Sequence, residues 1–381
     1  MTYWDYNAAA PVRPEVAALL SRAFASSGFG NASSVHQEGR AARARLDAAR
    51  AKVAGVLGCE PKEVSFTGSG SEADALALVG AWHLRPQPER RRVVTSAVEH
   101  PALLGAVAQL EREGAHVVRV APGPEGRVRE ADLLEALTPD TALCSLMWAN
   151  NETGVLQPAR EVALACRRRG VLFHTDAVQA AGKVPLSLRE VDADLLSLSA
   201  HKFGGPPGVG VLLVRKRVDV RALTPGHQEG GRRGGTQNVP YAEALALALE
   251  LAAAELPETA ARLTALRDAF EREVTARLPG VYVNGGAAPR VPNTSNLRFD
   301  DVEGESLLIA LDLEGICVSS GAACASGTLT PSHVLRAMGL SPAQARGSLR
   351  FSMGPGTTES DVTRVVDALV RHVPKVRALA G

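Results

Sequence analysis

Short strand-like runs alternate along this chain with longer stretches rich in alanine, leucine and arginine, and this alternation limits the possible folds most strongly. The strand-like runs are 92–95, 116–120, 171–174, 195–199 and 209–214. The helical stretches are 36–58, 71–84, 101–113, 130–137, 158–169 and 240–278. Strands that alternate with helices form a largely parallel, buried sheet, so the sequence predicts an α/β fold.

The stretch 240–278 also bears on the domain organisation. A chain of 381 residues is long enough for two or three domains. Pro257 interrupts this otherwise apolar, alanine-rich stretch, and proline lacks the N–H donor that a helix interior needs. We therefore expect the helix to break at Pro257, with a hinge there between a large domain and a smaller C-terminal one.

The composition excludes several classes of protein. The formal net charge is +1, so no overall field attracts nucleic acid or anionic lipid. No apolar stretch approaches the roughly 18 residues that a membrane helix needs, and the N-terminus lacks the pattern of a signal peptide. Five cysteines without a CxxC pair form neither a disulfide framework nor a zinc site. We expect a cytoplasmic protein without membrane or nucleic-acid partners.

Polar, glycine-containing segments follow several predicted strands, where ligands bind in open α/β sheets. In residues 67–74, Thr-Gly-Ser-Gly-Ser leads into a helix whose free N–H groups suit a phosphate, although a serine N-cap explains the same letters equally well. His100 precedes Pro101, so it can stack on a flat ring, move a proton or cap the helix. The polar residues 150–154 favour a turn.

Two charged residues stand at the ends of apolar strands. A buried, unpaired carboxylate at Asp176 needs a cationic partner, either an arginine or the protonated ring nitrogen of a cofactor. A partly desolvated amine at Lys202 has a lowered pKa and is nucleophilic. A phosphate cradle, an aspartate and a lysine, in this order in one α/β chain, are the groups that bind pyridoxal 5'-phosphate.

With these motifs, essentially the whole chain resembles the cysteine desulfurases of the NifS/IscS branch, which are fold-type I (aminotransferase class V) pyridoxal-phosphate enzymes. The matching stretches are residues 29–31, 67–74, 99–100, 150–154, 176–179, 199–202, 233–238, 319–324 and 349–354. The resemblance implies a large domain (13–256) with a mainly parallel seven-stranded sheet between helices. It also implies a smaller α+β domain (1–12 and 257–381) that carries a cysteine loop at about 319–332.

The resemblance assigns a role to each cofactor-binding residue. Lys202 matches the lysine that bonds the aldehyde, Asp176 the partner of the ring nitrogen, and His100 the histidine that stacks on the ring and moves protons. Thr236 matches a phosphate contact from the other subunit, which implies a homodimer with shared sites. The remaining contacts are the phosphate ligands Gly70, Ser71, Ser199 and His201, and the ring or substrate contacts Asn151 and Gln179.

The substrate side follows in the same way. Asn31, Asn151 and Arg350 match substrate-binding residues, and a guanidinium suits a carboxylate because it binds both oxygens. Cys324 matches the nucleophile that takes sulfur from L-cysteine as a persulfide and leaves L-alanine, with Lys202 as the base. The sulfur then passes to an acceptor or scaffold protein, for iron–sulfur cluster assembly or thiolation. No resident metal is implied, although an iron–sulfur cluster can be held transiently at Cys324.

The other cysteines, the departures from the family pattern and two alternatives complete the sequence reading. Cys59, Cys144, Cys166 and Cys317 are interpreted as packing residues. Ala8-Ala9-Ala10-Pro11 replaces the family's Ala-Thr-Thr-Pro, and Ser71 replaces a threonine. The chain is alternatively another fold-type I enzyme, such as a selenocysteine lyase or aminotransferase, which does not need Cys324, or a non-catalytic sulfur-carrier scaffold, which needs no cofactor.

Overall fold

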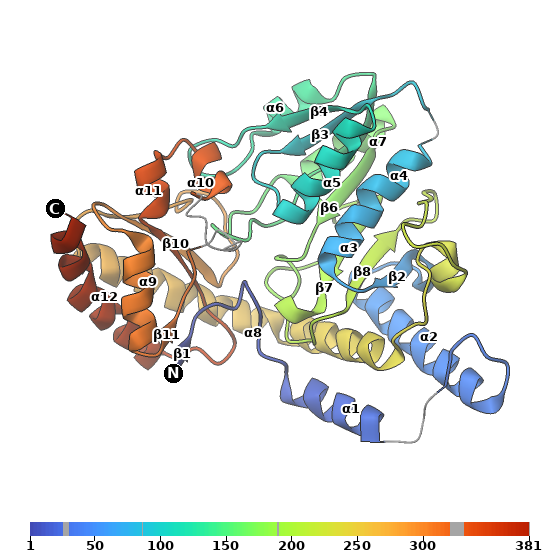
Figure 1. Cartoon of the computed structure of the whole chain (residues 1–381), viewed down its shortest axis with the longest axis horizontal. Coiled ribbons are helices and arrows are strands. Elements are labelled where there is room, and N and C mark those ends of the chain that lie inside the picture. The colour runs from blue at the N-terminus through green and yellow to red at the C-terminus, as the bar shows by residue number, and fades with distance from the viewer. Residues whose placement is uncertain (26–29, 86, 189, 321–330, 381) are drawn as a thin grey trace.

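A computed structural model describes residues 1–25, 30–85, 87–188, 190–320 and 331–380 (Figure 1). Its large sheet consists of β2 (Val64–Thr67), β3 (Arg92–Ser96), β4 (His116–Val120), β5 (Thr141–Ser145), β6 (Leu172–Asp176), β7 (Leu195–Ser199) and β8 (Gly210–Val214). The strand order is β2-β8-β7-β6-β5-β3-β4, and only β8 runs against the others. The predicted seven-stranded, mainly parallel sheet is therefore confirmed.

Helices cover both faces of this sheet. They are α1 (Pro14–Ala25), α2 (Gln37–Leu57), α3 (Gly70–Ala75) with its continuation through a π-turn (Leu76–Gly80) into α4 (Ala81–His83), α5 (Pro101–Arg112), α6 (Glu130–Ala136), α7 (Ala159–Arg169) and α8 (Val239–Arg277). Successive strand residues point to opposite faces. Val93 and Leu143 accordingly pack against α3–α5, whereas Val94 and Cys144 pack in the core that contains α2, α7 and the first half of α8. The predicted strands and helices all occur, with ends within two residues of those expected.

A second, smaller core lies around an antiparallel sheet of β12 (Ser348–Ser352), β10 (Thr294–Phe299) and β9 (Val281–Val283). β1 (Thr2–Tyr3) pairs in parallel with β11 (Ile316–Cys317), so the N-terminus joins this part of the molecule. Trp4 is buried there, with its ring edge-on to Phe270 at 5.0 Å. The remaining helices are α9 (Gly304–Leu313), α10 (His333–Ala337), α11 (Pro342–Arg346) and α12 (Glu359–Ala380). Within the described ranges, no helix is long and apolar enough to cross a membrane.

The prediction that the helix breaks at Pro257 is wrong. α8 is continuous through this residue and connects the two cores (Figure 1). Pro257 removes the N–H that would donate to the Ala253 carbonyl, but Ala253 is exposed, so water can reach this carbonyl. Burial on both sides supports the helix, because Leu245 and Leu249 pack in the first core and Phe270 in the second.

A tight turn after β5 brings residues 150–154 into position. The Oδ1 atom of Asn150 accepts hydrogen bonds from the backbone N–H groups of Glu152 (3.0 Å) and Thr153 (2.9 Å), as the turn prediction requires. Gly154 closes the turn with a φ of 75°, a conformation that disfavours residues with a Cβ atom. A Cβ atom at Gly154 would also lie 2.8 Å from the Cβ of Thr294 in β10. The turn thus needs glycine for both conformation and space.

We expect Gly154→Ala to lower the free energy of unfolding by about 2–4 kcal/mol, because left-handed strain and overpacking add. Gly230→Ala is the matched control, since Gly230 has a φ of 66° but no atom within 4 Å of the place that a Cβ atom would occupy. That variant should lose only about 1 kcal/mol. Urea denaturation of both variants measures the difference, and equal losses would show that the contact with Thr294 is unimportant.

Candidate active site

The carboxyl ends of five strands meet along one edge of the large sheet. β2, β3, β5, β6 and β7 run in the same direction, and the segments that follow them carry most of the predicted site residues. Gly70 and Ser71 follow β2, His100 follows β3, and Asn151 follows β5. Asp176 ends β6, and Lys202 follows β7 in a single 3₁₀ turn (Ala200–Lys202).

Lys202 is held by the backbone of the N-terminal segment. Its Nζ atom donates hydrogen bonds to the carbonyl oxygens of Asn7 and Ala8, both at 2.8 Å. Burial and then the charge of Arg350 lower the pKa of Lys202 to about 8, against the opposing effect of Asp176. Ala8 matches the alanine of the family pattern and contributes only its carbonyl group, so the departures at Ala9 and Ala10 leave this contact in place.

Asp176 is a buried carboxylate with 5% exposure. Its Oδ1 atom accepts a hydrogen bond from the backbone N–H of Val178 at 2.9 Å. Burial raises its pKa to about 6, although the Val178 N–H and the charge of Lys202 act in the opposite direction. Asp74 lies deeper, and burial followed by the charge of Asp176 raises the pKa of Asp74 well above its usual value. A cation beside Asp176 would stabilise its ionised form.

His100 caps α5, which confirms the capping interpretation. Its Nδ1 atom accepts a hydrogen bond from the backbone N–H of Ala102 at 3.1 Å. Burial, followed by the charges of Lys202 and His333, lowers the pKa of His100 to about 4, so the ring is neutral at pH 7. Since Nδ1 accepts, the hydrogen-bond pattern assigns the proton to Nε2. Capping therefore fixes both the ring and its tautomer.

The start of α3 fits both interpretations of residues 67–74, a serine N-cap and a binding site for phosphate. Ser69 is the N-cap, and its Oγ atom accepts from the Glu72 N–H at 3.0 Å, while Glu72 accepts from the Gly68 N–H at 2.7 Å. The next N–H groups, of Gly70 and Ser71, have no acceptor within the helix because they lie in its first turn. They suit an anion.

Ser199 and His201 lie beside this helix start. The Ser199 hydroxyl pairs with the His201 Nδ1 atom at 2.9 Å. A Cβ atom at Gly70 would lie 3.0 Å from the Cβ of Ser199, so glycine permits the close approach of helix and loop. The four predicted phosphate contacts therefore come from two adjoining segments.

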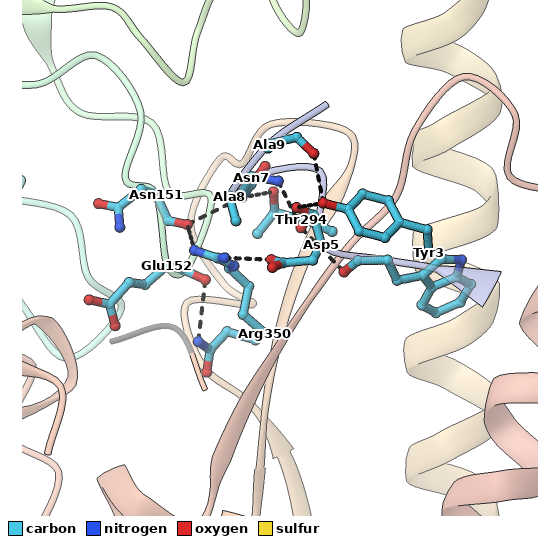
Figure 2. Close-up of polar contacts among 12 residues, drawn as sticks. Tyr3, Asp5, Asn7, Ala8, Ala9, Asn151, Glu152, Thr294 and Arg350 are labelled. Carbon is cyan, nitrogen blue, oxygen red and sulfur yellow. Dashed lines mark hydrogen bonds and ion pairs between the residues drawn. The ribbon is translucent and has the colours of Figure 1, made fainter. Parts of the chain in front are cut away.

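Arg350 projects from β12 toward the turn after β5 (Figure 2). Its Nη1 atom donates to the carbonyl oxygen of Asn151 at 3.0 Å, and its Nη2 atom pairs with Asp5 at 2.7 Å. The same Asn151 carbonyl accepts from the Asn7 side chain at 3.2 Å. The Asn151 Oδ1 atom is buried and has no hydrogen-bond partner among the described residues.

Three residues that sequence reasoning missed complete this arrangement. Asn7 accepts from the Gln179 Nε2 atom at 3.0 Å through its carbonyl oxygen and from the Lys183 Nζ atom at 2.7 Å through Oδ1. Lys183 also donates to the Gln179 Oε1 atom, and Asp5 holds Arg350. The sequence offered one signal for Asp5 and Asn7: they are polar residues within the otherwise aromatic N-terminal stretch Tyr3-Trp4-Asp5-Tyr6-Asn7.

Not every predicted residue joins this cluster. Asn31 is exposed, and its Oδ1 atom accepts from the Ser33 backbone N–H at 2.9 Å. Thr236 is also exposed, in the loop before α8. Cys324 lies outside the described residues, together with residues 321–330 of the predicted cysteine loop. Among the other cysteines, Cys144 and Cys166 are buried, while Cys59 and Cys317 are half-buried.

This fold, with a lysine and a buried aspartate at neighbouring strand ends, is typical of α/β enzymes that use pyridoxal phosphate. The chain belongs to the aminotransferase class-V family, which matches residues 2–365. A cysteine desulfurase of Cereibacter sphaeroides is 47% identical over 382 residues, which cover 99% of this chain and 97% of that protein.

Solved structures agree with this assignment. A NifS-like protein is 34% identical and superposes with a TM-score of 0.90, over 98% of this chain and 99% of its own. SspA in complex with cysteine is 31% identical, with a TM-score of 0.82 over 94% of this chain and 100% of its own. These similarities confirm the predicted α/β fold.

Acetylation of the cofactor-free protein tests the state of Lys202. Acetic anhydride reacts with neutral amines, and a pKa of about 8 leaves roughly a tenth of the amine neutral at pH 7. We expect the labelling of Lys202, followed by peptide mass spectrometry, to rise with pH with a midpoint of about 8. The exposed Lys52 is the internal control for reagent reactivity. A midpoint above pH 10 at Lys202 would contradict the lowered pKa.

Proposed function

We propose that this protein is a cysteine desulfurase that binds pyridoxal 5'-phosphate through Lys202 and transfers the sulfur of L-cysteine to Cys324. The observation that carries the proposal is the Lys202 amine, with its pKa lowered to about 8, near the buried carboxylate of Asp176. Relatives that are cysteine desulfurases, with up to 47% identity over nearly the whole chain, supply the substrate class.

The residues fit this cofactor. Lys202 would bond the aldehyde, Asp176 would face the ring nitrogen, and the N–H groups of Gly70 and Ser71 would bind the phosphate. The buried Asn151 Oδ1 atom, which has no partner among the described residues, suits a donor from the ring or the substrate. When bound, pyridoxal phosphate draws electrons from the amino acid and so makes its Cα–H and Cβ–S bonds easier to break.

Side chains of the protein would bind the substrate and move its protons. Arg350 binds the α-carboxylate of cysteine. In its neutral form, the Lys202 amine would remove the Cα proton of the substrate. His100 is neutral at pH 7 with its proton on Nε2, so it can donate that proton or restrain the ring by stacking.

Cys324 completes the reaction in this proposal. Its thiolate attacks the sulfur of the substrate, the Cβ–S bond breaks, and an S–S bond forms. The electron pair of the broken bond stays with the three-carbon fragment, which takes up protons and leaves as L-alanine. Cysteine and the Cys324 thiol thus become alanine and a Cys324 persulfide, with atoms and electrons in balance.

Replacement of the nucleophile tests this chemistry. We expect Cys324→Ser to lower alanine release from L-cysteine by at least a hundredfold and to leave the near-visible absorbance of the bound cofactor unchanged. Cys59→Ser is the control, because burial raises the pKa of Cys59 to about 12 and makes it a poor nucleophile. Mass spectrometry should find the added sulfur on the Cys324 peptide of the wild type. Full activity of Cys324→Ser would favour a selenocysteine lyase or another fold-type I enzyme.

We further propose that the enzyme is a homodimer in which Thr236 of each subunit binds the phosphate in the other subunit's site. The exposure of Thr236 in the single chain supports this arrangement, because a residue in a shared site must face outward.

Subunit mixing tests this arrangement. Lys202→Ala and Thr236→Ala should each be nearly inactive alone, and equimolar co-refolding should restore activity. In the mixed dimer, the Thr236→Ala subunit keeps Lys202 and receives Thr236 from its partner. If Thr236 acts within its own subunit, no mixed dimer has a complete site and activity stays lost. Two Lys202→Ala preparations mixed together are the control.

Delivery of the sulfur requires an acceptor. We propose that the Cys324 persulfide passes to a sulfur-acceptor or scaffold protein, for iron–sulfur cluster assembly or thiolation. A free thiol at Cys324 needs a reducing compartment, and the four described cysteines are free thiols. These observations support a cytoplasmic location.

A further inference from the structure

Asp5 forms an ion pair with Arg350, the proposed substrate clamp. The Arg350 Nη2 atom lies 2.7 Å from the Asp5 Oδ1 atom, and Figure 2 shows the guanidinium between Asp5 and the turn at Asn151. Both side chains are largely shielded from water, with exposures of 5% for Arg350 and 22% for Asp5. A bridge in this setting is far less screened by salt than a surface pair.

Asp5 cannot readily move away from Arg350, because its backbone is fixed on both sides. Its neighbour Trp4 is buried against Phe270, with the rings 5.0 Å apart. Ser352 donates its N–H to the Trp4 carbonyl at 2.8 Å, and its own carbonyl accepts from Tyr6 at 3.2 Å. Asp5 also forms a β-bridge with Ser352, two residues beyond Arg350 on β12. One short stretch of strand therefore fixes both partners.

The guanidinium keeps donors free for a second anion. Asp5 engages Nη2, and the Asn151 carbonyl engages Nη1 at 3.0 Å. The Nε atom is buried and has no acceptor among the described residues. A buried N–H without a partner is destabilising, so an arriving carboxylate gains by binding it.

We propose that Asp5 is a positioning residue for amino-acid recognition: it holds Arg350 by Nη2 so that Nε and the remaining N–H groups face the α-carboxylate of the substrate. Asp5 stays in place when the substrate binds, because its backbone is fixed and Nε is free. Its negative charge also offsets a guanidinium that would otherwise lie buried near Lys202 and Lys183. The proposal rests on the proposed function, since it deepens the recognition of cysteine.

The backbone that follows Asp5 also links the position of Arg350 to that of Lys202. The carbonyl groups of Asn7 and Ala8, two and three residues further on, bind the Lys202 amine. The same rigid segment therefore positions both Arg350, which would bind the substrate carboxylate, and the Lys202 amine. An amino acid whose carboxylate is held by Arg350 is thereby placed at a fixed distance from Lys202.

The test is the kinetics of Asp5→Asn in the cofactor-loaded enzyme, with Asp5→Ser measured alongside. Loss of the charge frees the guanidinium to turn, so we expect the KM for L-cysteine to rise at least tenfold while kcat stays within about twofold. Titration calorimetry with L-alanine should show the same loss of affinity without any turnover. Asp367→Asn, which removes a surface bridge to Arg277 at 2.8 Å, is the control and should change neither constant.

A double-variant comparison shows whether Asp5 acts through Arg350. In an Arg350→Ala background, Asp5→Asn should cause no further loss of alanine affinity. An equal loss in both backgrounds would overturn the proposal, as would a fall in kcat with KM unchanged. A lower KM in Asp5→Asn would also overturn it, because Asp5 would then compete with the substrate. Failure of the wild type to convert cysteine to alanine would instead refute the proposed function.

Discussion

The N-terminal segment, residues 2–8, connects the two halves of the site. Its β1 strand and Trp4 belong to the smaller core, while the carbonyl groups of Asn7 and Ala8 bind Lys202 at the edge of the large sheet. Asp5 holds Arg350 between these two anchors. In the proposed function, both ends of the substrate meet groups fixed by these few residues, so the geometry of the site would depend on how firmly this segment is packed.

The electrostatics beneath the site prepare it for a cation. Asp176, Asp74 and Glu99 are buried carboxyl groups, and burial is the main cause of the raised pKa of each. Three nearby histidines are neutral at pH 7, since burial lowers the pKa of His100 and of His201 to about 4 and that of His174 to about 3. The cations that the described residues place near the site are Lys202 and Lys183, whose pKa values burial lowers, and Arg350, which pairs with Asp5. In the proposed function, a protonated ring nitrogen beside Asp176 would place a positive charge next to its carboxylate.

Local pattern was sufficient to predict five of the seven strands, the helices from α2 to α8 and the strand-end residues Asp176 and Lys202, because these follow from periodicity and from the position of loops after strands. The seven-stranded sheet was implied by the family resemblance. Local pattern also gave the two interpretations of His100, which caps a helix as well as facing the site. Three features escaped it for a shared reason. Asp5 and Arg350 are 345 residues apart in sequence, and Asn7 and Lys202 are 195 apart. The continuity of α8 through Pro257 likewise depends on burial in two cores, which no local window contains.

The central claim is that Lys202, and no other lysine, bonds the cofactor opposite Asp176. Lys183 is the main alternative, because it is also buried and binds Asn7 and Gln179 beside the site. Borohydride reduction of the pyridoxal-phosphate-loaded enzyme, followed by peptide mass spectrometry, locates the bond directly. The account predicts the reduced adduct on the peptide that contains Lys202. An adduct on the Lys183 peptide, or none at all in a protein that binds the cofactor, would contradict it.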